Sequence, residues 1–270
     1  MTGSAGQTGE MARKEQKFTQ MTAEHQAAIY MIGIGPGSIQ MMTPQAQEAI
    51  RQADVVVGYT VYVDLVKDLC KGKEVLSTGM RREEERCNLA LEQARAGKCV
   101  AFVCSGDAGV YGMAGIMLEI AKNDPEITIE VIPGITAASS GAAVLGAPLI
   151  HDFAVISLSD LLTPWELIEK RLWLAAEADF VIVLYNPRSH KRKEHLARAV
   201  QIMGEHKAFD TPCGYVKNIG RPEEAGYLTT LGELAGNEEI DMFTTVFIGN
   251  SQTKFLNGKL VTPRGYRSEK

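Results

Sequence analysis

Several familiar functional patterns are missing from this 270-residue sequence. The five histidines make no HExxH or other metal-ligand spacing, so no resident metal is expected. There is no GxSxG segment to hold a nucleophilic serine and no GK[ST] triplet to hold a phosphate. The five cysteines form no CxxC pair, and their odd number favours reduced thiols in a cytoplasmic protein.

A basic excess and a long apolar run are missing as well. Acidic residues number 33 and basic residues 28, and the net charge of −5 argues against broad nucleic-acid binding. No apolar run approaches the roughly 20 residues that span a bilayer. Residues 1–27 lack the apolar core of a signal peptide, and we interpret them, with 263–270, as tails. We therefore expect a cytoplasmic protein without nucleic-acid or membrane partners.

Short apolar runs alternate with amphipathic stretches along the rest of the chain. Strands are expected at Ile29–Ile34, Val55–Val57, Glu74–Leu76, Val100–Cys104, Ile127–Ile132, Phe153–Ser157, Phe180–Tyr185, Gly214–Lys217, Gly226–Thr230 and Thr244–Ile248. Helices are expected at Pro44–Gln52, Val61–Leu69, Glu83–Ala96, Gly112–Lys122, Pro164–Ala176, His190–Met203 and Leu231–Ala235. The first of these helices has Thr43 as a candidate N-cap and Pro44 at its first position.

This order predicts an α/β protein of two domains. Val- and Ile-rich strands separated by helices indicate a mainly parallel sheet in residues 28–147. The later strands follow one another more closely, which predicts a mixed sheet in residues 148–262. We place the boundary at Gly146-Ala147-Pro148, where a helix ends and Gly and Pro interrupt the pattern.

Glycine is in surplus, and many of the glycines gather in loops that follow predicted strands. The chain holds 26 of them, where average usage would give roughly 19. Three such loops are Gly33–Ser38, Cys104–Gly112 and Pro133–Ser139. A dinucleotide fingerprint is disfavoured because Ser38 replaces its last glycine and Pro36 has no N–H to offer a phosphate. A ligand-facing role is favoured, but tight turns, helix capping by Asp107 and close helix–sheet packing remain alternatives.

Polar segments follow other predicted strands. They are Met80–Arg86, Ser157–Asp160 and Leu184–Ser189, the last of which runs into the basic segment 190–193. Paired surface charges or a solvated helix face would also account for them. Because all of these loops stand at strand carboxyl ends, where open α/β sheets bind ligands, their shared location favours one cleft.

As an ordered set, these motifs resemble the tetrapyrrole (corrin/porphyrin) methylase family of S-adenosylmethionine-dependent methyltransferases. The resemblance runs from about Ile29 to Val261 and is carried by the glycine loops, by Tyr111, and by Gly249-Asn250 after the last long strand. It implies the two-domain fold of that family, with the cofactor in a cleft between the domains, and a homodimer. A cofactor without phosphate would also explain why Pro36 is acceptable in the first loop.

A narrower resemblance points to one branch of the family. The segments Gly79–Glu83, Ser157–Trp165 and Leu184–Ser189 look like the precorrin-3B or cobalt-factor III C(17)-methyltransferases of cobalamin biosynthesis. Members of this branch methylate ring carbon 17 and promote contraction of the macrocycle. The resemblance thus implies a tetrapyrrole substrate, with cobalt present only if the substrate carries it.

The family's site can be transferred to matching positions of this sequence. The implied cofactor-binding residues are Pro36, Ser105, Gly106, Asp107, Val110, Tyr111, Thr136, Ala137, Tyr185, Asn186, Val216 and Thr245. Candidates for proton transfer during ring contraction are Glu83, Asp107, Ser159 and Asp160. Candidates for substrate binding are Gly35, Arg81, Arg82, Arg86, Ser157, Arg188 and Lys191. Arginine suits this last role because its guanidinium pairs with carboxylates in a bidentate manner.

Three other functions are considered. A relative within the family could methylate another position such as ring carbon 11 or 20, or act on diphthine or ribosomal RNA. A nicotinamide-dependent oxidoreductase is disfavoured because the second strand ends in Val57-Gly58-Tyr59, with no acid for the ribose hydroxyls. A non-catalytic sensor would keep the cofactor loops, but the many polar groups on the substrate side favour an enzyme.

Overall fold

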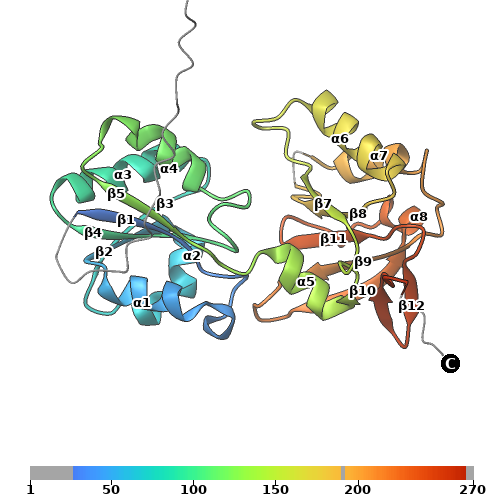
Figure 1. Cartoon of the computed structure of the whole chain (residues 1–270), viewed down its shortest axis with the longest axis horizontal. Coiled ribbons are helices and arrows are strands. Elements are labelled where there is room, and N and C mark those ends of the chain that lie inside the picture. Colours follow the sequence, from blue (N-terminus) through green and yellow to red (C-terminus); the bar gives the residue numbers. More distant parts are fainter. Residues whose placement is uncertain (1–26, 190–191, 266–270) are drawn as a thin grey trace, which may run out of the picture.

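Two five-stranded sheets organise the chain, one in each of two α/β domains (Figure 1). The computed structural model describes residues 27–189 and 192–265. Most of the predicted tail residues, 1–26 and 266–270, therefore lie outside the described part, as does the start of the helix predicted over His190–Met203. Within the described ranges, no helix combines the length and the apolar character needed to cross a membrane.

The first domain is built on a sheet whose five strands are all parallel, with the order β3-β2-β4-β1-β5. The strands are β1 Ala28–Gly33, β2 Val55–Tyr59, β3 Glu74–Thr78, β4 Cys99–Cys104 and β5 Thr128–Ile132. Two hydrophobic cores cover its faces. One face packs against α1 Pro44–Gln52 and α2 Thr60–Leu65, and the other against α3 Glu83–Arg95 and α4 Ala114–Ile120. Short 3-10 turns lie at Ile39–Met41, Lys67–Leu69 and Ala121–Asn123.

Local sequence signals account for these elements. Strands such as Val55–Tyr59 are apolar and buried because helices cover both faces of the sheet. The predicted start of the first helix is confirmed, since the Thr43 hydroxyl accepts a 3.1 Å hydrogen bond from the Ala46 N–H and Pro44 stands at its first position. The five predicted strands of this domain all form, within two residues of the expected limits.

The second domain holds a mixed sheet with the order β10-β9-β11-β8-β7. Its strands are β7 Phe153–Ser157, β8 Val181–Tyr185, β9 Pro212–Lys217, β10 Ala225–Thr230 and β11 Thr244–Ile248. Only the β7–β8 pair is parallel, which confirms the mixed sheet. One face packs against α6 Trp165–Glu177, α7 His195–Met203 and α8 Leu231–Leu234. The other face packs against α5 Ala137–Leu145.

Three short strands were not expected from the sequence. They are β6 Gly146–Ala147, β12 Lys254–Leu256 and β13 Lys259–Val261, and they form a small separate sheet. Segments of two or three residues are too short to show a recognisable period. Helix α7 also begins later than expected, at His195, because Ser189 and Arg192 first pair as an isolated bridge.

Helix α5 determines how the two domains divide. Its buried residues Ala138 and Ala142 pack in one cluster with Val216 and Phe247 of the second sheet. Gly141 lies so close to Phe247 that an added Cβ would stand 2.8 Å from the ring. The sequence pattern indicates only that a helix ends near Gly146, and it assigns residues up to 147 to the first domain. From its packing we propose that the second domain begins before α5, near Thr136.

Candidate active site

The three glycine loops meet at the carboxyl ends of β1, β4 and β5, which are neighbours in the first sheet. Gly35 and Gly106 exchange two backbone hydrogen bonds, with N···O distances of 3.0 and 2.7 Å. A Cβ added to Gly33 would stand 2.6 Å from the Gly134 nitrogen and 2.7 Å from the Gly106 oxygen. The loops are therefore packed backbone against backbone, and glycine is required where they touch.

Asp107 ties two of these loops together. Its Oδ1 accepts hydrogen bonds from the N–H groups of Gly109 (2.8 Å) and Val110 (3.1 Å), and its Oδ2 accepts one from Gly134 (2.9 Å). The alternative of a helix cap is wrong, because α4 begins only at Ala114, after Met113. Since both carboxylate oxygens are engaged by the backbone, the geometry favours an anchoring role for Asp107 over proton transfer.

The chemistry of the loops fits S-adenosylmethionine. Asp107 is the only charged residue in the segments 33–38, 105–111 and 133–139. A phosphate-bearing cofactor would favour basic side chains and free N–H donors here, whereas S-adenosylmethionine has no phosphate and carries positive charge on its sulfur and amino group. The space beside Gly106 is bordered by the backbone of Thr136 and Ala137, 3.7 and 3.9 Å from an added Cβ. The backbones of the three residues thus stand close together, with room for a methyl-sized group beside Gly106.

Four of the predicted site residues of the second domain lie in one row across its sheet. Ser157 pairs with Tyr185, and Thr245 pairs with Val216. In the antiparallel pair of β11 and β8, Val246 lies opposite Leu184. Thr245 precedes Val246 and Tyr185 follows Leu184, so these two residues lie beside each other as well. The four residues share the sheet face that α5 covers, because partners in register point to the same side. The register thus brings together residues that are far apart in the sequence.

Tyr185 connects this row to the first domain's loops. Its hydroxyl lies 2.6 Å from the Thr136 hydroxyl and accepts a 2.7 Å hydrogen bond from the Ala138 N–H. Burial raises the pKa of Tyr185, so its phenol stays neutral at physiological pH. The side chain therefore fixes the segment that leads from the third glycine loop into α5.

Tyr111 makes a second connection. It is exposed and left-handed, with φ of 53°, and its ring centroid lies 5.7 Å from that of Tyr185. Its hydroxyl donates to the Val155 carbonyl (3.0 Å) and accepts from the Ser157 N–H (3.2 Å). Those backbone groups belong to β7, the edge strand, whose outer side needs hydrogen-bond partners.

A third contact between the domains joins the Arg221 guanidinium to the buried Pro36 carbonyl at 3.4 Å.

Ser157 is the centre of a smaller polar group. Its Oγ accepts hydrogen bonds from the Asn186 side-chain amide (3.0 Å) and from the Ser159 N–H (3.2 Å). Asn186 adopts a left-handed backbone with φ of 52°, which turns its side chain back toward Ser157. Predicted cofactor and substrate residues thus contact one another here, and within residues 27–189 and 192–265 the Ser157 hydroxyl proton has no assigned acceptor.

Asp160 lies just beyond this group and pairs with two residues that the sequence analysis did not assign. Its carboxylate is 3.2 Å from His195 Nε2 and 3.9 Å from Arg192 Nη1. Burial raises the pKa of the Asp160 carboxyl, but hydrogen bonds from His195 and its own backbone and the nearby positive charges outweigh this, so the pKa is lowered overall. The basic character of 190–193 is a sequence signal for Arg192, whereas no pattern singles out His195.

The arginines predicted to bind the substrate differ in how far they are buried. Arg86 is buried, and its Nε donates to the Thr78 hydroxyl (2.9 Å) while its Nη2 donates to the Gly79 carbonyl (2.8 Å). This engagement differs from the expected substrate contact. Arg81 and Arg82 are exposed, and Arg82 pairs with Glu85 at 3.2 Å. Arg188 donates to the Asn237 carbonyl at 3.1 Å, and Lys191 lies outside the described residues.

Glu83 and its neighbouring arginines stand apart from the other candidates. They follow β3, which β2 and β4 separate from β1. At about 4.8 Å between strands, the carboxyl end of β3 lies roughly 14 Å from that of β1, where the first glycine loop begins. That distance suits contact with the rim of a large ligand. Among the predicted proton-transfer residues, Ser159 and Asp160 are neighbours in the loop after β7, whereas Glu83 begins α3 of the first domain.

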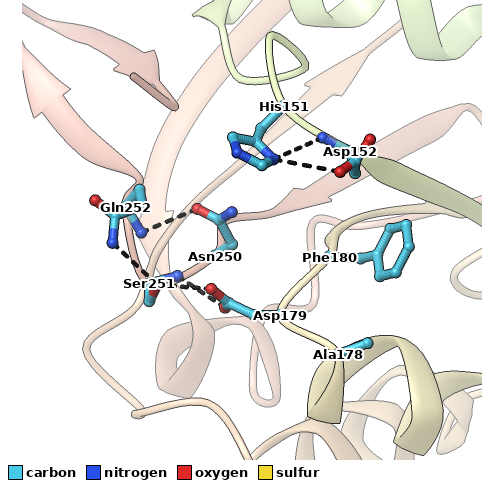
Figure 2. Close-up of a pocket in the computed structure, with 8 residues that line it drawn as sticks. All are labelled: His151, Asp152, Ala178, Asp179, Phe180, Asn250, Ser251 and Gln252. Atoms are coloured by element: carbon cyan, nitrogen blue, oxygen red, sulfur yellow. Dashed lines mark hydrogen bonds and ion pairs between the residues drawn. The ribbon is translucent and has the colours of Figure 1, made fainter. Parts of the chain in front are cut away.

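A small cavity of about 200 Å³ lies at the other end of the second sheet (Figure 2). It is lined by His151, Asp152, Ala178, Asp179, Phe180, Asn250, Ser251 and Gln252. These residues precede β7 and β8 and follow β11, whereas Ser157 and Tyr185 end β7 and β8. The cavity is therefore separate from the candidate active site.

Comparison with known proteins agrees with this geometry. Residues 28–235 match the family of tetrapyrrole (corrin/porphyrin) methylases. A Salmonella typhimurium protein described as a probable cobalt-factor III C(17)-methyltransferase is 53% identical over 237 residues, which cover 87% of this chain and 98% of that protein. The precorrin-3B C(17)-methyltransferase of a Sinorhizobium species is 39% identical over 247 residues, covering 88% and 96% of the two chains.

Among solved structures, the chain resembles one described as the crystal structure of the methyltransferase CobJ. The TM-score is 0.81 at 37% identity, and the match covers 87% of this chain and 98% of that one. The similarity thus spans most of this chain and nearly all of that one.

Proposed function

The chain belongs to the tetrapyrrole (corrin/porphyrin) methylase family, and from this premise we propose that it methylates ring carbon 17 of a cobalamin precursor, using S-adenosylmethionine, with contraction of the macrocycle. The observation that carries the proposal is the near full-length identity of 53% to a probable cobalt-factor III C(17)-methyltransferase. Identity to a precorrin-3B enzyme is lower, at 39%, which favours the cobalt-containing substrate.

The glycine loops and Tyr185 would hold the cofactor. S-adenosylmethionine supplies a methyl group that is already activated by a positively charged sulfur. Asp107 holds the second and third loops in register and adds the one negative charge in these segments. Tyr185 fixes Thr136 and Ala138 relative to the second sheet. Such positioning of two reactants can contribute roughly 7–11 kcal/mol to a bimolecular step.

Ring contraction requires a proton transfer in addition to methylation. We assign this role to the group that includes Ser157, Ser159 and Asp160. Asp160 is held in its ionised form by His195 and Arg192, and the Ser157 hydroxyl can donate a hydrogen bond. Asp107 is less suited, because three backbone N–H groups already engage its carboxylate.

We further propose that the protein acts as a homodimer in the cytoplasm. All five cysteines are free thiols, and burial raises the pKa of Cys104 and Cys213 to about 12. Thiols of this kind are inert and need no oxidising compartment. Light scattering of the purified protein would test the dimer directly.

A labelled-methyl assay tests the proposed reaction. The purified protein is incubated with labelled S-adenosylmethionine and with precorrin-3B or cobalt-factor III, and the products are examined by mass and absorption spectra. We expect one methyl group per macrocycle and the spectrum of a contracted ring, with faster turnover of cobalt-factor III. Failure to label any macrocycle, or labelling at ring carbon 11 or 20, would contradict the proposal.

A further inference from the structure

Two neighbouring leucines are exposed in the loop that joins β7 to α6. The side chains of Leu161 and Leu162 are 62% and 91% exposed. A single exposed leucine is ordinary on a protein surface. Two at the same loop tip form a small exposed apolar patch, which water solvates poorly. Their position next to Asp160 makes the loop relevant to the candidate active site.

The loop is anchored at its start. The side chain of Leu158 is fully buried in the core of the second domain, and its N–H donates to the Tyr185 carbonyl at 2.9 Å. The next N–H, that of Ser159, donates to the Ser157 hydroxyl. These contacts fix the residues that lead directly to the tip.

The loop is also anchored at its end. The Trp165 ring packs against the second domain's core and meets the His195 ring edge to face, at 4.5 Å between centroids. The Arg198 guanidinium lies over the Trp165 ring, 4.6 Å from its centroid. Between these anchors, Asp160 pairs with His195 and Arg192. The leucines are therefore held outward by a fixed framework.

The tip belongs to the loop that begins beside a contact between the two domains. Its loop starts at Ser157, whose N–H is bound by Tyr111 of the first domain. In Figure 1 the loop before α6 extends from the second domain toward the first. The Arg192 guanidinium stands nearby, 3.9 Å from the Asp160 carboxylate, and Arg188 belongs to the same segment after β8. An apolar patch beside positive charges complements a ligand with an apolar body and carboxylates at its edge.

We propose that Leu161 and Leu162 pack against the face of the tetrapyrrole macrocycle and determine its affinity. The inference rests on the proposed function, and it assigns a substrate contact to two residues with no such role in the sequence analysis. Asp160 then has a second task, because its pairs with His195 and Arg192 hold the tip in place. The leucines contribute binding free energy by leaving water when the macrocycle arrives.

The double variant Leu161→Ser/Leu162→Ser tests the proposal. Both side chains are exposed, so the fold loses no core contacts. We expect the dissociation constant and the KM of cobalt-factor III to rise about tenfold or more, because partial burial of two leucines is worth at least 1.4 kcal/mol. Quenching of tryptophan fluorescence measures macrocycle binding without turnover. Calorimetry with S-adenosylhomocysteine should give an unchanged affinity.

A matched control is Leu118→Ser/Leu174→Ser, which changes two leucines that are 50% and 46% exposed on α4 and α6. It should leave macrocycle binding unchanged. The inference would be overturned if the tip variant bound the macrocycle with wild-type affinity. It would also be overturned if the variant changed from a dimer to a monomer while macrocycle binding stayed intact, because the leucines would then form a subunit contact. If the wild-type protein binds but does not methylate the macrocycle, the proposed function fails while the binding comparison still decides this inference.

Discussion

The hydroxyl groups of Tyr185 and Thr136 lie 2.6 Å apart and join the second sheet to the segment that enters α5. The same phenol accepts the Ala138 N–H at 2.7 Å, close to the amino end of that helix. Because four N–H groups at a helix start have no partner within the helix, this bond satisfies one of them. Tyr185 thus contributes to the junction of the domains, at the edge of the cofactor site that we propose.

Tyr185→Phe should lower both the stability of the fold and the affinity for the cofactor. The variant leaves the Ala138 N–H without its partner, and we expect a loss of about 1–3 kcal/mol in the free energy of unfolding. Cofactor affinity should fall as well. Urea unfolding and calorimetry with S-adenosylhomocysteine measure the two effects. Tyr227→Phe, on the edge strand β10, is the control, and equal effects of both variants would contradict the assignment.

Asp107→Asn should reduce cofactor affinity by roughly tenfold to a hundredfold, because a charge-assisted hydrogen bond is lost and an amide N–H opposes a backbone N–H. The matched control is Asp54→Asn, whose carboxylate accepts the Cys99 N–H at 2.8 Å at the opposite end of the same sheet. Both variants should lower stability, but only the first should change the affinity measured by calorimetry.

Gly134→Ala should destabilise the protein by at least about 2 kcal/mol, because its new Cβ would overlap the carbonyl oxygens of Gly33 and Gly106. Gly115→Ala offers the opposite result. That position in α4 has open space around its Cβ site, and alanine should stabilise the helix by up to about 1 kcal/mol. Thermal unfolding compares them, and an unchanged melting temperature in Gly134→Ala would show that the loops can separate.

Arg81→Ala should weaken substrate binding, whereas Arg86→Met should lower the stability of the fold. Arg81 is exposed, so its loss should raise the KM for the macrocycle with little change in stability. Arg86 is buried with donors to Thr78 and Gly79, so its loss should cost about 2–3 kcal/mol of stability. If Arg81→Ala leaves macrocycle affinity unchanged, the assignment of this arginine to the substrate is wrong.

Stability should depend on pH through Asp160. Its pKa is lower in the folded protein than in the unfolded chain, so the ionised form stabilises the fold above the unfolded value near 4. This contribution is lost as the pH falls through the lower folded pKa. Because the carboxylate is partly exposed, we expect it to stay below about 1 kcal/mol. The difference in unfolding free energy between wild type and Asp160→Asn should shrink below pH 4, and a difference that grows there would contradict this sign.

Most of the longer strands and helices could be predicted because their signals are local, whereas the short strands β6, β12 and β13 and the limits of α5 could not. The burial of Val55–Tyr59 on both faces and the Thr43-Pro44 helix start follow from neighbouring residues alone. The glycine loops were located correctly for the same reason, since each follows an apolar strand. These patterns were sufficient for the α/β class, the parallel first sheet and the mixed second sheet.

The contacts between distant residues depended on the tertiary structure. Strand register places Ser157, Tyr185, Thr245 and Val216 in one row, although up to 88 positions separate them (157 to 245). The hydrogen bond from the buried Arg86 to Thr78 and the pairing of Asp160 with His195 likewise form only when packing brings these side chains together. A side chain's role depends on which groups surround it after folding, and sequence periodicity reports only the face on which it lies. The sequence thus determined the elements and the positions of the loops, whereas packing decided which residues meet at the site.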